Sequence, residues 1–271
     1  MPTATHAGRM TWRRRTSRGE WLLWAAWLAF VALLVVCWEV MTKDTIWAFV
    51  ADAPQQAADI GSRMMPPRWS YISVLWRPLW DTVNMATLGT LLAIVFAVPI
   101  AFLAARTTTP SATLVRPLAL LVIVSSRSIN SLIWALLLVA VIGPGLLAGV
   151  FAIALRSIGF IAKLLYEAIE EIDETQLEAV RATGGSPAQV VDYAIVPQVL
   201  PAFAGISIFR WDINIREATV LGLVGAGGIG LQLQASLNTL AWPQVTLILL
   251  VILLSVIASE WVSAKVRHAI I

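Results

Sequence analysis

The sequence predicts an all-α, polytopic integral membrane protein. Of its 271 residues, 59% are hydrophobic and only 13% are charged, and the mean hydropathy is +0.80. These values lie outside the range of soluble globular domains. Six apolar stretches are each long enough to cross the bilayer as a helix, which takes about 20 residues. The predicted spans are residues 21–40, 79–105, 117–142, 146–165, 202–224 and 245–264.

The first apolar stretch follows an arginine-rich segment, as the core of a signal peptide would. The arginines are Arg13, Arg14, Arg15 and Arg18. The apolar run is longer than is typical of a signal peptide, and no Ala-x-Ala cleavage site accompanies it. We therefore expect residues 1–20 to be a tail and residues 21–40 to be a retained membrane anchor within a single transmembrane domain, residues 21–271.

Basic residues in the short connections predict the orientation, because such loops stay on the cytoplasmic side. A cytoplasmic N-terminus puts six later basic residues in or beside inner segments: Arg106, Arg116, Lys163, Arg181, Lys265 and Arg267. The connection 41–77 would lie outside, although it also carries basic residues, and we expect it to contain a short helix at the outer interface. Both termini are thus expected in the cytoplasm.

The long hydrophilic stretch on the inner side, residues 166–197, predicts a helical hairpin. Glu167–Thr183 is rich in helix formers, with acidic residues in its first turns, where they favour the helix dipole. Gly184 and Gly185 then supply a left-handed stop. The stretch is either an ordinary solvated loop or a rigid element that transmits movement from another protein.

The second helix of the hairpin carries its own start signal. Ser186, Pro187 and Gln189 have the features of a capping box with proline at the first helical position. The helix is expected to begin at Pro187 and to run to about Ala194. Two prolines, Pro197 and Pro201, are expected to end it before the next span.

The hairpin resembles the EAA loop of membrane subunits of ATP-binding-cassette (ABC) importers. The resemblance lies in Glu178-Ala179-Val180, then Gly184 after three residues, and Ala194-Ile195-Val196-Pro197 after nine more. An alanine stands where that family usually has isoleucine, and Val196 where it usually has leucine. The resemblance implies a type I importer permease fold and docking on a cytoplasmic ABC ATPase dimer, which uses ATP and Mg²⁺. The residues implied in docking are Glu178, Ala179, Arg181, Gly184, Gly185 and Ser186.

A narrower resemblance covers the chain from about Leu79 to its C-terminus. Phe209–Gly230, FRWDINIREATVLGLVGAGGIG, together with RSIN at Arg127–Asn130, is similar to the permease of phosphonate importers, which usually have proline at the position of Asn130. It implies import of phosphonates or phosphate-like oxyanions across the cytoplasmic membrane of a bacterium. The implied partners are an extracytoplasmic phosphonate-binding protein and a second, identical permease subunit within the lipid.

Charged residues within the predicted spans indicate either a pathway or internal ion pairs. At 100° per residue, Arg210, Asn214 and Glu217 share one face of the fifth span, and Asp212 and Arg216 share another. Either face could line a path while the other pairs with neighbouring helices. Three arginines against two acids leave one positive charge in excess, which suits an oxyanion. The expected path residues are Arg127, Asn130, Arg210, Asn214, Arg216 and Glu217.

The motif Gly225-x-Gly227-x-x-Gly230 matches a dinucleotide-binding fingerprint, but its surroundings do not. No acidic residue follows at about 20 positions, where the fingerprint needs one to hold the ribose, and no βαβ pattern surrounds it. Gly225, Gly227, Gly228 and Gly230 are instead expected to permit a tight turn with positive φ, either as a gate or as a plain re-entrant connection.

Other function classes find little support in the sequence. There is no P-loop for ATP, no nucleophile beside a base, and a single cysteine, Cys37, while His6 and His268 lie in the terminal segments. We expect no catalytic residue, metal, bound cofactor or nucleic-acid partner. The alternatives that remain are a permease for methionine or an osmolyte, and an ion-coupled transporter that uses Asp212 and Glu217 as proton sites.

Overall fold

The computed structural model describes residues 3–6, 9–12 and 17–270. Contacts divide the chain into two units, Met1–Asp59 and Ile60–Ile271. The described elements are helical apart from one antiparallel hairpin, β1 (Thr3–His6) with β2 (Arg9–Trp12), which confirms the all-α class.

The first unit contains the predicted N-terminal span. α1 (Ser17–Thr42) is apolar and long enough to cross a membrane. α2 (Trp47–Met64) follows within the segment 41–77 and forms the helix expected there. Residues 72–77, expected to belong to that connection, are instead the first turns of the next helix.

The second unit is a helical bundle built on three long helices. These are α3 (Ile72–Ala104, preceded by the 3-10 turn η1, Trp69–Tyr71), α6 (Leu146–Glu170) and α9 (Val196–Leu221). α3 packs chiefly on α6 through small buried residues, and a Cβ on Gly89 would lie 2.7 Å from Ile153 Cγ2. Small side chains let membrane helices approach closely, which is where van der Waals packing stabilises them.

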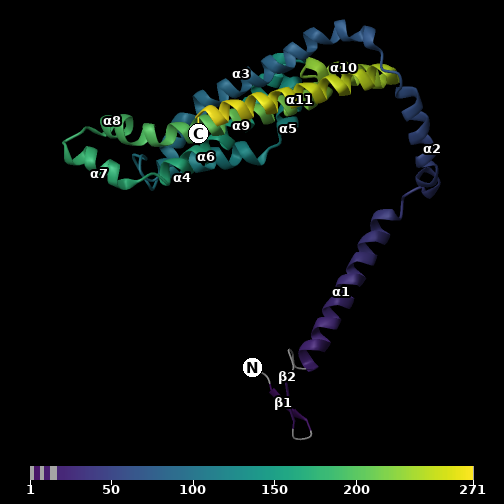
Figure 1. Cartoon of the computed structure of the whole chain (residues 1–271), viewed down its shortest axis with the longest axis horizontal. Coiled ribbons are helices and arrows are strands. Elements are labelled where there is room, and N and C mark those ends of the chain that lie inside the picture. The colour runs from purple at the N-terminus through teal and green to yellow at the C-terminus, as the bar shows by residue number, and fades with distance from the viewer. Residues whose placement is uncertain (1–2, 7–8, 13–16, 271) are drawn as a thin grey trace. The chain divides into compact units, whose positions relative to one another are not determined.

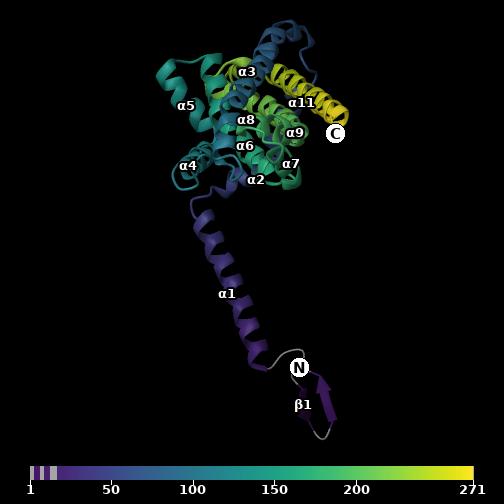
Figure 2. The same cartoon turned by 90° about the vertical axis from the view of Figure 1, so that its left-hand side faces the viewer.

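The remaining helices cover this core. α4 (Val115–Ser128) and α5 (Ser131–Ile142) pack on α6, and α11 (Trp242–Ile270) packs on α9. Figure 2 shows α4 and α5 on one side of the bundle and α11 on the other. α10 (Gly228–Asn238) contacts α3 and α11 near one end, while the hairpin of α7 (Glu174–Ala182) and α8 (Pro187–Val190) lies at the opposite end (Figure 1).

The third predicted span, 117–142, is not one straight helix. α4 and α5 are bent by 88° at Ile129 and Asn130, so the described residues contain five helices that could span a membrane, or six if this pair counts as one. Asn130 has an extended backbone, and its side chain accepts a hydrogen bond from the Leu132 amide at 3.1 Å. The break is stable because Asn130 caps α5.

The first helix of the hairpin differs from the prediction of Glu167–Thr183. α6 continues to Glu170, and a separate helix, α7, begins at Glu174. The break forms because the Asp173 carboxylate caps α7 through the Thr175 amide at 2.9 Å, while its own amide donates to Gln198 Oε1 at 3.0 Å.

The second helix begins at Pro187 as predicted but does not end near Ala194. α8 continues through a π-helical turn, η2 (Val191–Ile195), into α9, so the prolines at 197 and 201 do not interrupt it. The wider π turn accommodates a proline, which lacks an N–H and would clash with the carbonyl four residues earlier. Pro187–Val224 is therefore one helical path.

Candidate functional site

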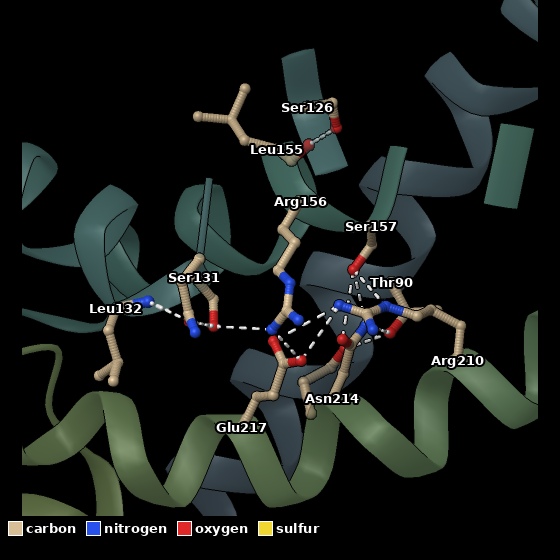
Figure 3. Close-up of polar contacts among 12 residues, drawn as sticks. Thr90, Ser126, Ser131, Leu132, Leu155, Arg156, Ser157, Arg210, Asn214 and Glu217 are labelled. Atoms are coloured by element: carbon tan, nitrogen blue, oxygen red, sulfur yellow. Dashed lines mark hydrogen bonds and ion pairs between the residues drawn. The ribbon is translucent and has the colours of Figure 1, made fainter. Parts of the chain in front are cut away.

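A chain of polar side chains connects four helices in the middle of the bundle. It begins at the N-terminus of α5, crosses α6 and α9, and ends on α3 (Figure 3). The members are Asn130, Ser131, Arg156, Glu217, Arg210, Ser157, Asn214 and Thr90. The network includes all three residues that were predicted to share one face of α9, namely Arg210, Asn214 and Glu217.

Arg210 is the buried centre of the network. Its side chain is 3% exposed, its Nε donates to Ser157 Oγ at 2.9 Å, and its Nη2 lies 3.4 Å from both Glu217 oxygens. The guanidinium carbon also sits 5.0 Å from the centroid of the Phe160 ring. A buried charge needs such partners, because removing it from water is costly. Arg210 is thus held rigidly inside the bundle.

Arg156 is a member that sequence reasoning missed. It lies on α6, is 32% exposed, and its Nη1 is 2.5 Å from Glu217 Oε1 and 3.4 Å from Ser131 Oγ. A signal was available: Arg156 stands near the middle of the apolar stretch 146–165, about 15 Å from either end of a helix. An arginine at that depth requires an internal partner or water.

The charge balance at membrane depth changes with this residue. Four guanidiniums, Arg127, Arg156, Arg210 and Arg216, stand against the two carboxylates of Asp212 and Glu217. Among these six groups the excess is two positive charges, compared with one when Arg156 is left out. Arg127 itself is exposed in the last turn of α4.

Asn214 is fully buried and joins three helices. Its amide nitrogen donates to Thr90 Oγ1 on α3 at 2.7 Å and to Ser157 Oγ on α6 at 3.1 Å. Its side-chain polar atoms are hydrogen-bonded inside the bundle, so Asn214 connects the three helices.

The second polar face of α9 forms an ion pair. Asp212 and Arg216 are in direct contact, one helical turn apart, and Ser259 Oγ of α11 donates to Asp212 Oδ1 at 2.7 Å. Asp212 is buried, whereas the Arg216 side chain is 49% exposed. The pair ties α9 to α11 and leaves one guanidinium partly accessible.

A cavity of about 270 Å³ lies among α5, α6 and α9. Its polar lining is formed by Asn130, Ser131, Arg156, Arg216 and Glu217, and the other lining residues are aliphatic. Three of the expected path residues, Asn130, Arg216 and Glu217, therefore meet there, together with Arg156. Arg127, Arg210 and Asn214 are not part of the lining.

The glycine-rich segment turns between η3 (Gly222–Val224) and α10. Gly225, Gly227 and Gly228 have positive φ values of 90°, 84° and 70°, as expected, but Gly230 does not. Gly230 is required for another reason, because a Cβ there would collide with the Thr219 carbonyl oxygen on α9. Close helix contact rather than turn geometry explains this fourth glycine.

The turn is packed into the bundle at two points. The Gly145 amide donates to the Gly225 carbonyl at 3.0 Å, and the Ile229 amide donates to Thr82 Oγ1 on α3 at 2.8 Å. These bonds join the segment to the α5–α6 turn and to α3, and so hold it at one end of the bundle.

The EAA-like hairpin presents its motif to the surroundings. Glu178, Ala179, Arg181, Gly184 and Ser186 are exposed, and Gly185 is half-buried. The amides of Gly184 and Gly185 donate to the carbonyls of Arg181 and Val180, the two bonds of a Schellman motif. Both bonds of the Ser186 and Gln189 capping box are also formed. The hairpin is therefore a rigid, accessible element.

Comparisons with known proteins agree with this architecture. Residues 97–268 match the family model described as binding-protein-dependent transport system inner membrane component. The chain is 40% identical over 260 residues to the phosphite transport system permease protein PtxC of Stutzerimonas stutzeri, with 94% of each chain covered. It is 38% identical over 240 residues to the phosphate-import permease protein PhnE of Mycolicibacterium smegmatis, covering 89% of this chain and 44% of that protein.

Solved structures support the fold. The MetNI methionine ABC transporter, in inward-facing conformations, matches with a TM-score of 0.65 at 21% identity, over 75% of this chain and 99% of that one. A bacterial alginate ABC transporter matches with a TM-score of 0.57 at 14% identity, over 92% and 96%. The chain belongs to the family of binding-protein-dependent transport system inner membrane components, and is an ABC importer permease that resembles the phosphite, phosphate and phosphonate permeases.

Proposed function

We propose that this chain is the membrane-spanning half of an ATP-driven importer of phosphorus oxyanions, namely phosphonates and the related phosphite and phosphate. The carrying observation is the cavity at membrane depth, where Arg156 and Arg216 are partly exposed beside Glu217. Guanidinium groups match phosphoryl oxygens by paired hydrogen bonds. The names of two relatives, a phosphite and a phosphate permease, support the same substrate class.

The partly exposed charges also favour a second permease subunit. Arg127 and the half-exposed Arg216 lie within spans, where facing lipid would be costly. Each is better placed against water or protein, as in a dimer that encloses a path between two identical chains. An extracytoplasmic binding protein would deliver the oxyanion to the outer end, where the glycine-rich turn is packed.

Coupling to a separate ATPase dimer is proposed to run through the hairpin. The exposed Glu178 and Gly184 would dock on the ATPase, whose sites use ATP and Mg²⁺. Movement of α8 would pass directly into α9, since the two are parts of one helical path. The polar network on α9 would then shift against α6, and the path would alternate between inward and outward access. Each ligand changes that equilibrium only through its different affinity for the two states.

Reconstitution of the permease with its ATPase and binding protein in proteoliposomes tests this function. ATP-dependent uptake of labelled phosphite, phosphate or methylphosphonate is expected, and methionine and betaine should not compete. Uptake without the ATPase that is abolished by an uncoupler would instead identify an ion-coupled transporter. Competition by methionine or betaine alone would assign another solute.

The docking role has its own variant. Glu178→Arg reverses an exposed charge in the motif and should lower uptake per ATP hydrolysed at least tenfold, because a reversed rim charge repels the former partner. Gln176→Arg, also exposed on α7, is the matched control and should transport normally. Full coupled uptake by Glu178→Arg would exclude this docking role.

A further inference from the structure

The cavity among α5, α6 and α9 already contains an anion that belongs to the chain, the Glu217 carboxylate. We propose that Glu217 is an internal competitor for a translocated oxyanion: it holds Arg156 while the cavity is empty, and a phosphorus oxyanion takes Arg156 from it on entry. This inference rests on the proposed function and assigns the residues of its anion subsite.

Arg156 is placed to exchange partners. Its side chain is about one-third exposed, and it lines the cavity. In the described part of the chain, both of its hydrogen bonds come from Nη1, to Glu217 and to Ser131. The Nη2 and Nε donors are unused there, so the guanidinium retains donors for an oxyanion. A planar guanidinium can form two parallel bonds to a phosphoryl group.

Glu217 does not lose its charge partner when Arg156 turns away. Both of its oxygens lie 3.4 Å from Nη2 of Arg210. Arg210 is itself immobilised by Ser157 and by the Phe160 ring. An unpaired carboxylate would be strongly disfavoured at this depth, and Arg210 removes that penalty. Arg210 is therefore a positioning residue for Glu217.

The second guanidinium of the cavity is held in the same way. Arg216 is half-exposed and is paired with Asp212, which is buried and fixed by Ser259. In both pairs, a fixed carboxylate thus holds a more exposed guanidinium. A dianion that enters meets two donors, each of which already has an alternative partner.

This arrangement limits how tightly an oxyanion can bind. Two unopposed guanidiniums in a site of low polarity would hold a dianion strongly, whereas a carrier must release what it admits. Competition from Glu217 keeps the occupied state close in free energy to the empty one. Glu217 would thereby control the rate at which the oxyanion is released and the turnover of the transporter, rather than the rate at which the oxyanion enters.

Glu217→Gln is the direct test, because it removes the charge but keeps an oxygen that can accept from Arg210. The assembled transporter in nanodiscs, without binding protein or ATP, is titrated with labelled phosphate and with labelled phosphite. The variant should bind about tenfold more tightly than wild type and turn over more slowly in uptake, because the competing charge is gone. Arg156→Gln should weaken binding by a similar factor.

Glu167→Gln is the matched control. It also neutralises a glutamate in an ion pair, with Lys163 at 3.5 Å near the inner end of α6, and should leave both affinity and turnover unchanged. A purely structural role of Glu217 predicts weaker binding after substitution, so tighter binding distinguishes the two explanations.

The proposed role of Glu217 is overturned if wild-type uptake is normal but Glu217→Gln binds phosphate and phosphite no more tightly than the wild type does. If that variant unfolds, Glu217→Asp replaces it: the shorter carboxylate keeps its charge but loses reach to Arg156. Binding tighter than that of the wild type supports the proposal, and an unchanged or weaker affinity overturns it. If the wild type takes up no phosphorus oxyanion, the proposed function is refuted. In that case the identity of the anion that competes with Glu217 is refuted as well.

Discussion

Replacing Asn214 with leucine tests whether the buried polar network stabilises the contact among α3, α6 and α9. Asn214 donates to Thr90 Oγ1 at 2.7 Å and to Ser157 Oγ at 3.1 Å, and accepts from that same serine at 3.2 Å. Leucine has the same branched skeleton of side-chain heavy atoms as asparagine, so the change removes the hydrogen bonds without leaving a cavity.

The expected loss of stability depends on which hydrogen bonds the Thr90 and Ser157 hydroxyls keep after the substitution. Thr90 keeps its bond to the Ala86 carbonyl at 2.7 Å, and Ser157 keeps the one donated by Arg210. Neither group is therefore wholly orphaned. Hydrogen bonds between membrane helices contribute about 0.6 kcal/mol on average and about 1.7 at most. Two such connections predict a loss of roughly 1–3 kcal/mol in the free energy of unfolding.

Titration of the purified subunit with SDS in bicelles, followed by circular dichroism, measures this loss. Asn238→Leu on α10 is the control, since Asn238 is exposed, and it should change stability by less than about 0.5 kcal/mol. A double-mutant cycle with Thr90→Val isolates the bond between α3 and α9. If Asn214→Leu costs no more than the control, the network does not stabilise the bundle.

Three further predictions concern local geometry. Gly184 has a φ of +84°, so Gly184→Val should strain the hairpin and reduce uptake per ATP hydrolysed. Gly184→Asn should retain most of that uptake, because asparagine tolerates a positive φ. Equal effects of the two variants would show that the turn conformation is not required. Gly159→Ala puts a Cβ 2.5 Å from the Ile123 carbonyl oxygen and should lower the free energy of unfolding by about 1–3 kcal/mol in the same SDS titration. Gly61→Ala is the control, because open space surrounds that position. Equal stabilities of the two variants would contradict a tight contact between α6 and α4 at Gly159. Hydrogen bonds from the Thr175 side chain and amide lower the pKa of Asp173 below its ordinary 3.8. The stability that this cap contributes is therefore complete above pH 3.8 and is lost as the pH falls through the pKa of the folded state. Titration of the Asp173 carboxyl by NMR should show a midpoint below 3.8, and Thr175→Val should raise that midpoint.

Much of the fold followed from patterns that act over short distances along the chain. Long apolar runs predicted the helices that could span a membrane, and the Ser186 and Gln189 pair predicted the start of α8. Both signals depend on burial or on hydrogen bonds within one helix, so a single segment suffices to show them. The EAA-like motif likewise lies within one stretch.

The incorrect boundaries arose where a distant or local contact outweighed propensity. Helix formers predicted one helix over Glu167–Thr183, but the cap by Asp173 divides it. Prolines predicted an end to the second hairpin helix, but a π turn carries it onward. The apolar run 117–142 predicted one span, but Asn130 caps a new helix and the pair is bent by 88°. Hydropathy contains no information on such bends.

By itself, the sequence determined the membrane class, the hairpin signature and the two polar faces of α9, because hydropathy and helical periodicity are properties of one segment. Only the tertiary structure decided which face is buried and which partner each charge has. Arg156 and Glu217 are 61 residues apart, and Arg210 and Asn214 meet Ser157 on another helix. The periodicity of a helix gives the angle of a side chain about its own axis, whereas its partner depends on how the helices pack.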